Sequence, residues 1–193
     1  MKVRTALLIT VFLTHFLVAG CTAHRAPTSH CEQFTSTRTE PATTVILIRH
    51  AERQDDSHDT PLSGEGRARA VRLAQLVKDA GVDTILVSDR RRTHETASEV
   101  FTATGIPENQ AGDFKHDDPP ASVATRIRQT GFGHVVLVVA HAHYVHTILK
   151  QLGGWTVPPL TDFDQMFIIT LCPDGKDRLI RAAYPPNTPA RIP

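Results

Sequence analysis

The sequence has no marked excess of charge and few cysteines, and both shortages narrow the classes of protein to which it can belong. Its 193 residues carry 21 Lys and Arg against 20 Asp and Glu, a net charge of +1. So small a charge does not favour nucleic acid as a partner, since nucleic acids are bound by basic patches. Three cysteines are present, with no Cys-x-x-Cys or Cys/His spacing typical of zinc, so no metal site is predicted.

A long apolar stretch occurs only near the N-terminus. The basic segment MKVR precedes ALLITVFLTHFLVA, which is too short and too often interrupted by polar residues to span a bilayer comfortably. It ends in VAGC (18–21), which resembles the lipobox of bacterial lipoproteins. We therefore predict a lipoprotein signal peptide at 1–20 and lipidation of Cys21. Thr22, in place of aspartate, favours the outer membrane, facing the periplasm; ordinary secretion with cleavage near Ala23 is the alternative.

The remaining cysteines and the regions of low complexity complete the expected domain organisation. Cys31 and Cys172 form an even pair, and an exported chain meets an oxidising compartment, so a disulfide is one expectation and two unpaired thiols the other. Residues 21–43 are rich in Thr, Ser and Pro and lack hydrophobic periodicity, which predicts a tether. A folded domain is expected at 44–184, followed by a Pro-rich tail at 185–193.

Strand and helix patterns alternate along the expected domain, which is typical of an α/β fold with a mainly parallel sheet. Two apolar runs flank the turn CPDGKD and predict a C-terminal β-hairpin. The predicted fold has three layers: a mainly parallel central sheet, helices on both of its faces, and this hairpin. Strands are expected at 45–49, 84–88, 135–140, 165–171 and 178–184, and helices at 63–80, 90–105, 121–130 and 144–154. The first helix is expected to bury Leu73, Leu76, Val77 and Ala80.

Polar side chains follow three of the predicted strands. The first strand ends at Arg49 and His50, the second at Ser88, and the third at His141, with His143 two residues later. Ligands of α/β sheets bind beyond the carboxyl ends of the strands, where helix N-termini also point. The three clusters are therefore expected to converge on one rim of the sheet.

The order of these motifs resembles that of the histidine phosphatase superfamily, the phosphoglycerate mutase-like group, in its short single-domain branch. The resemblance covers most of the expected domain, in the motifs IRHAERQ, DTPLSGEGRARA, SDRRRTHETA and VVAHAH. It implies that His50 is the nucleophile and that Arg49 and Arg92 bind the phosphate. It also implies that His141 is the second histidine that contacts the transferring phosphoryl group.

The chemistry of these side chains agrees with what the resemblance implies. Two arginines offer planar forks that match phosphoryl oxygens. A neutral imidazole at His50 can attack phosphorus and form a phosphohistidine, and a protonated His141 can add positive charge. No cofactor or metal is needed, so the sequence predicts a metal-independent phosphomonoester hydrolase.

Several further residues have weaker expected roles. We expect Glu52 to orient a rim arginine, Ser88 to cap and pack, and His143 to lie near the rim. The sequence departs from the family pattern because Ala142-His143 follow the second histidine and because no acidic proton donor is evident. Asp113 is the best candidate for such an acid facing inward, ahead of Asp117 and Asp118. A hydrated loop is the preferred alternative, in which case esters with good leaving groups would be cleaved fastest.

Two alternative functions are compatible with the same motifs. A non-catalytic lipoprotein that binds phosphate or a polyanion would keep the arginines, but binding alone does not require His50 and His141. A phosphomutase would use the same four residues, but the short chain leaves little sequence for a lid. The expected partners are a small-molecule or glycan phosphate ester as substrate and a membrane reached through the lipid anchor. No oligomeric state is predicted.

Overall fold

The computed structural model describes residues 40–184. The predicted signal peptide and tail, together with Cys21 and Cys31, lie outside the described residues. Cys172 is a free thiol in the described part, and its predicted disulfide partner is not part of that range. Among the helices at 40–184, none has the length and apolar character needed to cross a membrane.

Five strands form one sheet in the order β2-β3-β1-β4-β5. The neighbours β2, β3 and β1 are parallel, whereas β4 is antiparallel to β1 and β5 is antiparallel to β4. The predicted α/β class and C-terminal hairpin are confirmed, and the parallel part of the sheet carries the polar strand ends. The strands are β1 (Thr43–Arg49), β2 (Thr84–Val87), β3 (Val135–Ala140), β4 (Gln165–Leu171) and β5 (Arg178–Ala183).

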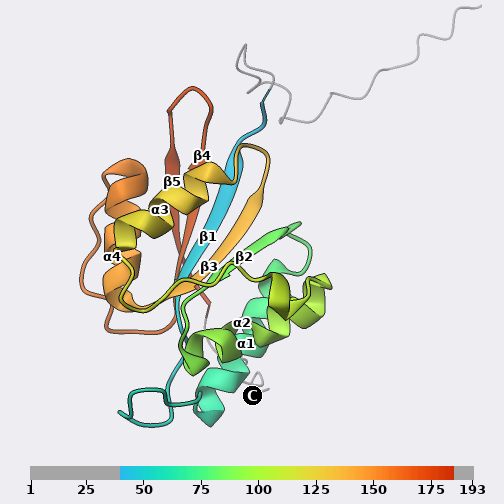
Figure 1. Cartoon of the computed structure of the whole chain (residues 1–193), viewed down its shortest axis with the longest axis vertical. Helices are drawn as coiled ribbons and strands as arrows, with labels where there is room; N and C mark the ends of the chain where they lie inside the picture. The colour runs from blue at the N-terminus through green and yellow to red at the C-terminus, as the bar shows by residue number, and fades with distance from the viewer. Residues whose placement is uncertain (1–39, 185–193) are drawn as a thin grey trace, which may run out of the picture. The chain divides into compact units, whose positions relative to one another are not determined.

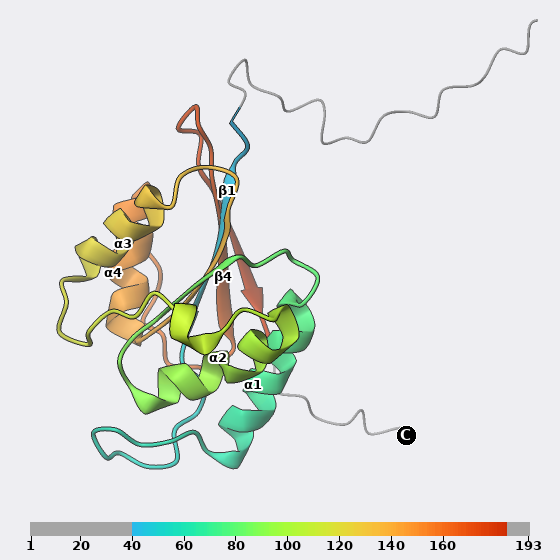
Figure 2. The same cartoon turned by 45° about the vertical axis from the view of Figure 1, so that its right-hand side comes forward.

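Helices cover both faces of this sheet, which gives the predicted three layers. The pair α1 and α2 lies on one face and the pair α3 and α4 on the other (Figures 1 and 2). Each helix lies where the sequence predicts it, with small differences at the ends. The helices are α1 (Gly64–Val77), α2 (Arg91–Thr104), α3 (Pro120–Gln129) and α4 (Ala142–Gly153), with a short 3-10 helix η2 (Glu108–Gln110) after α2.

The core is divided between the two faces by the alternation of side chains along β1. Val45 and Leu47 pack in the cluster under α3 and α4, whereas Ile46 and Ile48 pack in the cluster under α1 and α2. Such strands are apolar throughout because both faces are covered. Each fully buried aliphatic side chain contributes about 1.5–3 kcal/mol of hydrophobic stabilisation, so the apolar run before Arg49 anchors the rim.

The predicted buried stripe of α1 is wrong at two positions. Leu76 is 44% exposed, and Ala80 lies beyond the end of the helix and is exposed. The buried positions instead follow the spacing expected of one helix face. They are Gly66, Arg69, Ala70, Leu73, Ala74 and Val77.

The first turn of α1 passes unusually close to the chain that follows β1. The Ser63 hydroxyl accepts a hydrogen bond from the Gly66 N–H (3.1 Å) and caps the helix. A Cβ atom added at Gly66 would lie 2.2 Å from the carbonyl oxygen of Glu52, whereas Gly64 has no atom within 4 Å of its added Cβ. The absence of a side chain at Gly66 therefore lets α1 approach the segment just beyond His50.

We expect Gly66→Ala to lower the free energy of unfolding by about 1–3 kcal/mol, because the methyl group forces α1 away from Glu52. Gly64→Ala is the matched control, and it should leave stability unchanged or raise it by up to about 1 kcal/mol through helix propensity. Chemical denaturation of both variants measures the difference. Equal stabilities of the two variants would contradict the close approach.

Candidate active site

The three polar strand ends meet on one rim, as the sequence predicts. Arg49 is paired with Ala140 in the parallel ladder, and the His50 N–H donates to the Ala140 carbonyl (2.8 Å). The rings of His50 and His141 are therefore neighbours, with centroids 5.1 Å apart in an edge-to-face arrangement. Both histidines and Arg92 are buried, with 4%, 4% and 8% of their surfaces exposed.

His50 is held in the form that a nucleophile requires. Its Nδ1 lies 2.7 Å from the Ala51 carbonyl, and Arg92 Nε donates to its Nε2 (3.3 Å). A carbonyl only accepts and a guanidinium only donates, so the proton is on Nδ1 and the lone pair is on Nε2. Burial, together with the charges of Arg92 and Arg49, lowers the pKa of His50 to about 3. The ring is thus neutral at physiological pH.

Arg92 links the two imidazoles. Besides the bond to His50, its Nη2 lies 3.5 Å from His141 Nδ1, and its Nη1 donates to the His58 carbonyl (3.0 Å). Burial is the main cause that lowers the pKa of Arg92, followed by the nearby charges of Arg90 and Arg53. A guanidinium placed in this way offers its fork to a group bound between His50 and His141.

Arg49 is tied to the loop that follows α4. Its Nη1 donates to the carbonyls of Leu160 (2.9 Å) and Thr161 (3.3 Å), and its guanidinium carbon lies 4.0 Å from the centre of the Phe163 ring. The Phe163 ring also lies beside His50, with centroids 5.7 Å apart. Burial lowers the pKa of Arg49, and its Nε is buried without a hydrogen-bond partner. The side chain therefore has an unused donor next to the nucleophile.

His141 is also neutral in the free protein, so the expectation that it is protonated is wrong for this state. Burial is the main cause that lowers its pKa to about 2, and the neighbouring His50 and the charge of Arg92 add to the effect. Because Arg92 donates to Nδ1, the His141 proton is on Nε2, 3.0 Å from Ser88 Oγ. Ser88 Oγ in turn lies 3.0 Å from Thr93 Oγ1. Ser88 thus orients His141 as well as packing.

Glu52 belongs to a buried ion pair behind the rim. Arg69, only 4% exposed, donates from Nε to both carboxylate oxygens of Glu52 (2.9 Å each) and from Nη1 to the Tyr184 carbonyl (2.8 Å). The Tyr184 hydroxyl donates to the Arg49 carbonyl (3.4 Å). Glu52 therefore orients Arg69, which fastens α1 and the chain after β5 to the strand that carries Arg49.

None of the three aspartates considered as proton donors is brought to His50. The Asp113 side chain is 57% exposed, and its carboxylate lies 4.0 Å from His94 on α2. Asp117 is exposed, and the Asp118 carboxylate accepts the N–H of Lys115 (2.9 Å). Asp113 therefore does not face inward, which agrees with the preferred alternative of a hydrated loop.

The same loop instead brings His116 to the site, a residue that the sequence analysis missed. Its ring meets His141 edge-to-face with centroids 4.5 Å apart, and His143 lies 5.5 Å from it. The His143 ring also lies parallel to that of His141, 6.0 Å away. A histidine in a polar loop gives no periodic signal, so only the contact itself identifies it. Despite these neighbouring rings, no group of three or more His, Cys, Asp or Glu within residues 40–184 is arranged to hold a metal ion.

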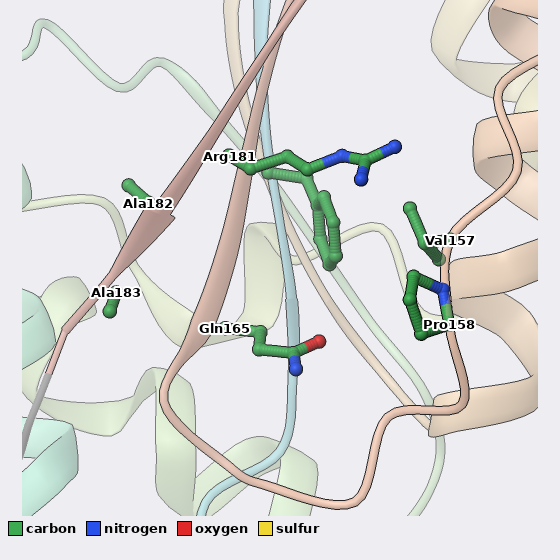
Figure 3. A pocket seen from close by; sticks show the side chains of 7 residues that line it. Val157, Pro158, Gln165, Arg181, Ala182 and Ala183 are labelled. Carbon is green, nitrogen blue, oxygen red and sulfur yellow. The ribbon is translucent and has the colours of Figure 1, made fainter.

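A separate cavity of about 400 Å³ lies between the C-terminal hairpin and the loop after α4. Figure 3 shows Gln165 and Arg181 extending from the hairpin toward Val157 and Pro158. None of the four predicted phosphate-site residues lines it. The loop that forms its wall also provides the contacts of Arg49, so the cavity lies beside the rim and outside the site itself.

Comparison with known proteins supports the predicted resemblance. Residues 45–115 match the family model described as histidine phosphatase superfamily (branch 1), in agreement with the predicted resemblance over that part of the chain. No curated protein is similar enough to count as a match. The chain also resembles solved structures in fold, and the likeness spans nearly the whole length of those structures.

Three of these structures illustrate the likeness. The protein histidine phosphatase SixA complexed with tungstate is 22% identical, with a TM-score of 0.61 over 72% of this chain and 96% of that one. A putative phosphohistidine phosphatase SixA from Agrobacterium tumefaciens is 22% identical, with a TM-score of 0.57 over 74% and 98%. The mycobacterial glucosyl-3-phosphoglycerate phosphatase is 16% identical, with a TM-score of 0.55 over 75% and 99%. At these identities the likeness establishes the fold.

The buried neutral histidines predict a pH-dependent stability. In the unfolded chain each would bind a proton below its ordinary pKa of about 6.5, whereas in the folded protein His50 does so only near pH 3. The contribution of the neutral His50 to the free energy of unfolding is therefore fully present above about pH 6.5, and it falls as the pH is lowered toward 3. Between pH 7.5 and pH 5 the free energy of unfolding of His50→Asn should fall by about 2 kcal/mol less than that of the unaltered protein.

Chemical denaturation at the two pH values measures this difference. Thr102→Asn is the control, because Thr102 is exposed on α2 and has no group that titrates between the two pH values. Its loss of stability between the two pH values should equal that of the unaltered protein. The same loss in His50→Asn would show that His50 is not held neutral by the fold.

Proposed function

We propose that this protein is a metal-independent phosphomonoester hydrolase that works through a phosphohistidine on His50. The observation that carries the proposal is the position of the His50 lone pair. Nε2 is the unprotonated nitrogen, and its only hydrogen bond in the described part comes from Arg92. The nucleophilic atom and a phosphate-binding guanidinium therefore face the same space.

In the first step of this mechanism the substrate phosphoryl group lies between the two imidazoles. Arg92 turns its donors from His50 Nε2 and His141 Nδ1 to the phosphoryl oxygens, and the unused Arg49 Nε supplies another donor. His50 Nε2 forms a bond to phosphorus as the ester P–O bond breaks. His50 then carries the phosphoryl group, and the ester oxygen leaves with the bonding electron pair as an alkoxide that takes up a proton.

In the second step water attacks the phosphorus of the phosphohistidine. The N–P bond breaks, and its electron pair returns to Nε2, which restores the neutral ring and releases inorganic phosphate. The Nδ1 bond to the Ala51 carbonyl persists through both steps and keeps the ring in one orientation. The dianionic phosphoryl group also supplies the negative charge that the half-buried Arg49 and the buried Arg92 lack in the free protein.

The geometry of the site bears on the mechanism more directly than on the choice of substrate. The related structures include phosphatases described as acting on protein histidine and on glucosyl-3-phosphoglycerate, so fold likeness does not choose between them. We propose a small-molecule or glycan phosphate ester, because an exported enzyme would meet few cytoplasmic phosphoproteins. Release of phosphate from a panel of such esters tests this choice, and activity confined to phosphohistidine peptides would overturn it.

We expect His50→Ala to abolish turnover, since no other residue supplies the nucleophile. Arg49→Ala and Arg92→Ala should each cost about 2–4 kcal/mol in kcat/KM, because each removes donors to the developing charge. Enzyme quenched during turnover should carry one phosphate that is acid-labile and base-stable, mapped to His50 by mass spectrometry. Full activity in His50→Ala would refute the mechanism.

A matched arginine control is available one residue from Arg92. Arg91 is exposed and pairs with Glu95, so Arg91→Ala should keep full activity. Turnover of a generic aryl phosphate also separates the alternatives, because a binding protein releases no phosphate and a mutase requires a phosphorylated cofactor. Activity should persist with a chelator, and dependence on an added divalent metal would contradict the proposal.

We further propose that the enzyme is held at the outer membrane, facing the periplasm, by a lipid on Cys21. The VAGC motif before the predicted tether is the basis of this proposal. Cys21→Ser should leave an uncleaved, unlipidated precursor, whereas Cys31→Ser should be processed normally. Mass spectrometry of the N-terminus after membrane fractionation measures both, and a mature N-terminus at His24 would indicate ordinary secretion instead.

A further inference from the structure

Two buried side-chain atoms in the described part of the chain have no hydrogen-bond partner: Arg49 Nε and His116 Nδ1. Buried polar atoms in folded proteins are nearly always paired, and an exception at a functional site calls for a functional reason. Phosphate binding gives that reason for Arg49. Neither phosphate binding nor nucleophilic attack gives such a reason for the unpaired Nδ1 of His116.

The backbone contacts of His116 fix it at the rim. Its N–H donates to a carboxylate oxygen of Asp89 (2.8 Å), directly after β2, and its carbonyl accepts from the Tyr144 hydroxyl on α4 (2.7 Å). Its ring stands perpendicular to the ring of His141, with an interplanar angle of 85°. The position of His116 is thus set by two elements of the fold, although the residue itself lies in a loop.

The contact between His116 and His141 bears on where the leaving group of the substrate must lie. In an in-line displacement the leaving atom is opposite the nucleophile, roughly 5 Å beyond His50 Nε2 once phosphorus is at reacting distance. The groups that hold the phosphoryl oxygens, Arg92 and His141, lie closer to His50. The His116 ring packs against the His141 ring, which in turn contacts the ring of His50.

We propose that His116 is a catalytic residue that donates a proton from Nδ1 to the leaving oxygen of the substrate. The inference rests on the proposed function and assigns the role for which no carboxylate was found. As the P–O bond breaks, its electron pair goes to the oxygen, which takes the proton of the His116 imidazolium. In the second step neutral His116 takes a proton from the attacking water, so that the ring is restored.

The charges around His116 fit a proton donor that is active only with substrate bound. In the free protein its pKa is lowered, mainly by burial and then by Arg90, His143 and Arg92, against which Asp89 acts. A phosphoryl dianion between the imidazoles adds negative charge beside the ring and favours its protonated form. The titratable and charged groups that face or flank it are Asp89, Arg90, Arg92, Lys115, Asp117, Asp118, His141, His143 and Tyr144.

The test is the dependence of kcat/KM on the leaving group, measured over a series from acidic aryl phosphates to simple alkyl phosphates. A positioned acid contributes about 10²–10⁴-fold, mainly for leaving groups that are poor. His116→Ala should therefore lower kcat/KM for alkyl phosphates by about 100-fold or more, yet lower it by less than about 5-fold for the most acidic phenols. The slope against leaving-group pKa should become steeper than in the unaltered enzyme.

A second variant separates hydrogen bonding from proton transfer. In His116→Asn an amide nitrogen takes the place of Nδ1 but cannot release a proton, so the steep slope should persist with a smaller loss of substrate affinity. This variant also serves if His116→Ala is too unstable to assay. His134→Asn, at the opposite end of β3, should keep the slope of the unaltered enzyme.

An equal loss on every ester, or no loss on any, would overturn the role of His116. The proposed function fails separately, if the unaltered enzyme hydrolyses no ester and forms no phosphate adduct on His50. An unaltered enzyme that labels His50 and turns over, combined with an unchanged slope in both His116 variants, would leave the phosphohistidine mechanism intact and remove only this inference.

Discussion

The parallel pairing of β1 with β3 determines where every group of the site lies. The two strands run in register up to Arg49 and Ala140, and the next residue of each is a histidine. The hydrogen bond from His50 N–H to the Ala140 carbonyl adds one more contact at the point where the chains leave the sheet. A slip of one residue would turn each side chain to the opposite face, so the buried apolar side chains on both faces of β1 enforce the alignment of two imidazoles.

The rim that results has an unbalanced charge. Arg49 and Arg92 are partly or wholly withdrawn from water, and their partners at the rim are carbonyls and imidazoles. The carboxylate that lies nearest in sequence, Glu52, is already paired with Arg69 behind the strand. Unpaired buried charge costs stability, and a bound anion offsets that cost in the place where binding is needed. The same positive charge adds to the effect of burial, which is the main cause that keeps both histidines neutral in the free protein.

Much of this arrangement could be predicted from the sequence because it depends on local patterns. Apolar runs with helices between them identify the parallel sheet, and polar residues at strand ends identify Arg49, His50 and His141. The contacts of His116 could not be predicted, since they join a loop without periodicity to a distant helix. The charge of His141 depends on burial, and the exposure of Leu76 depends on where α2 packs; neither is encoded in neighbouring residues. The lipid anchor and the tether remain predictions.

Tyr184, the last described residue, is fully buried and connects three parts of the fold. Its carbonyl accepts from Arg69 on α1, its hydroxyl donates to the Arg49 carbonyl, and its own N–H donates to the Asp164 carbonyl (2.8 Å). The minimal unit that can fold therefore has to include this residue, although the hairpin strand before it is largely exposed. A recombinant domain can be extended beyond residue 184 by a purification tag, but a domain shortened to Ala183 would leave the buried guanidinium of Arg69 without one acceptor and the backbone behind His50 without its brace.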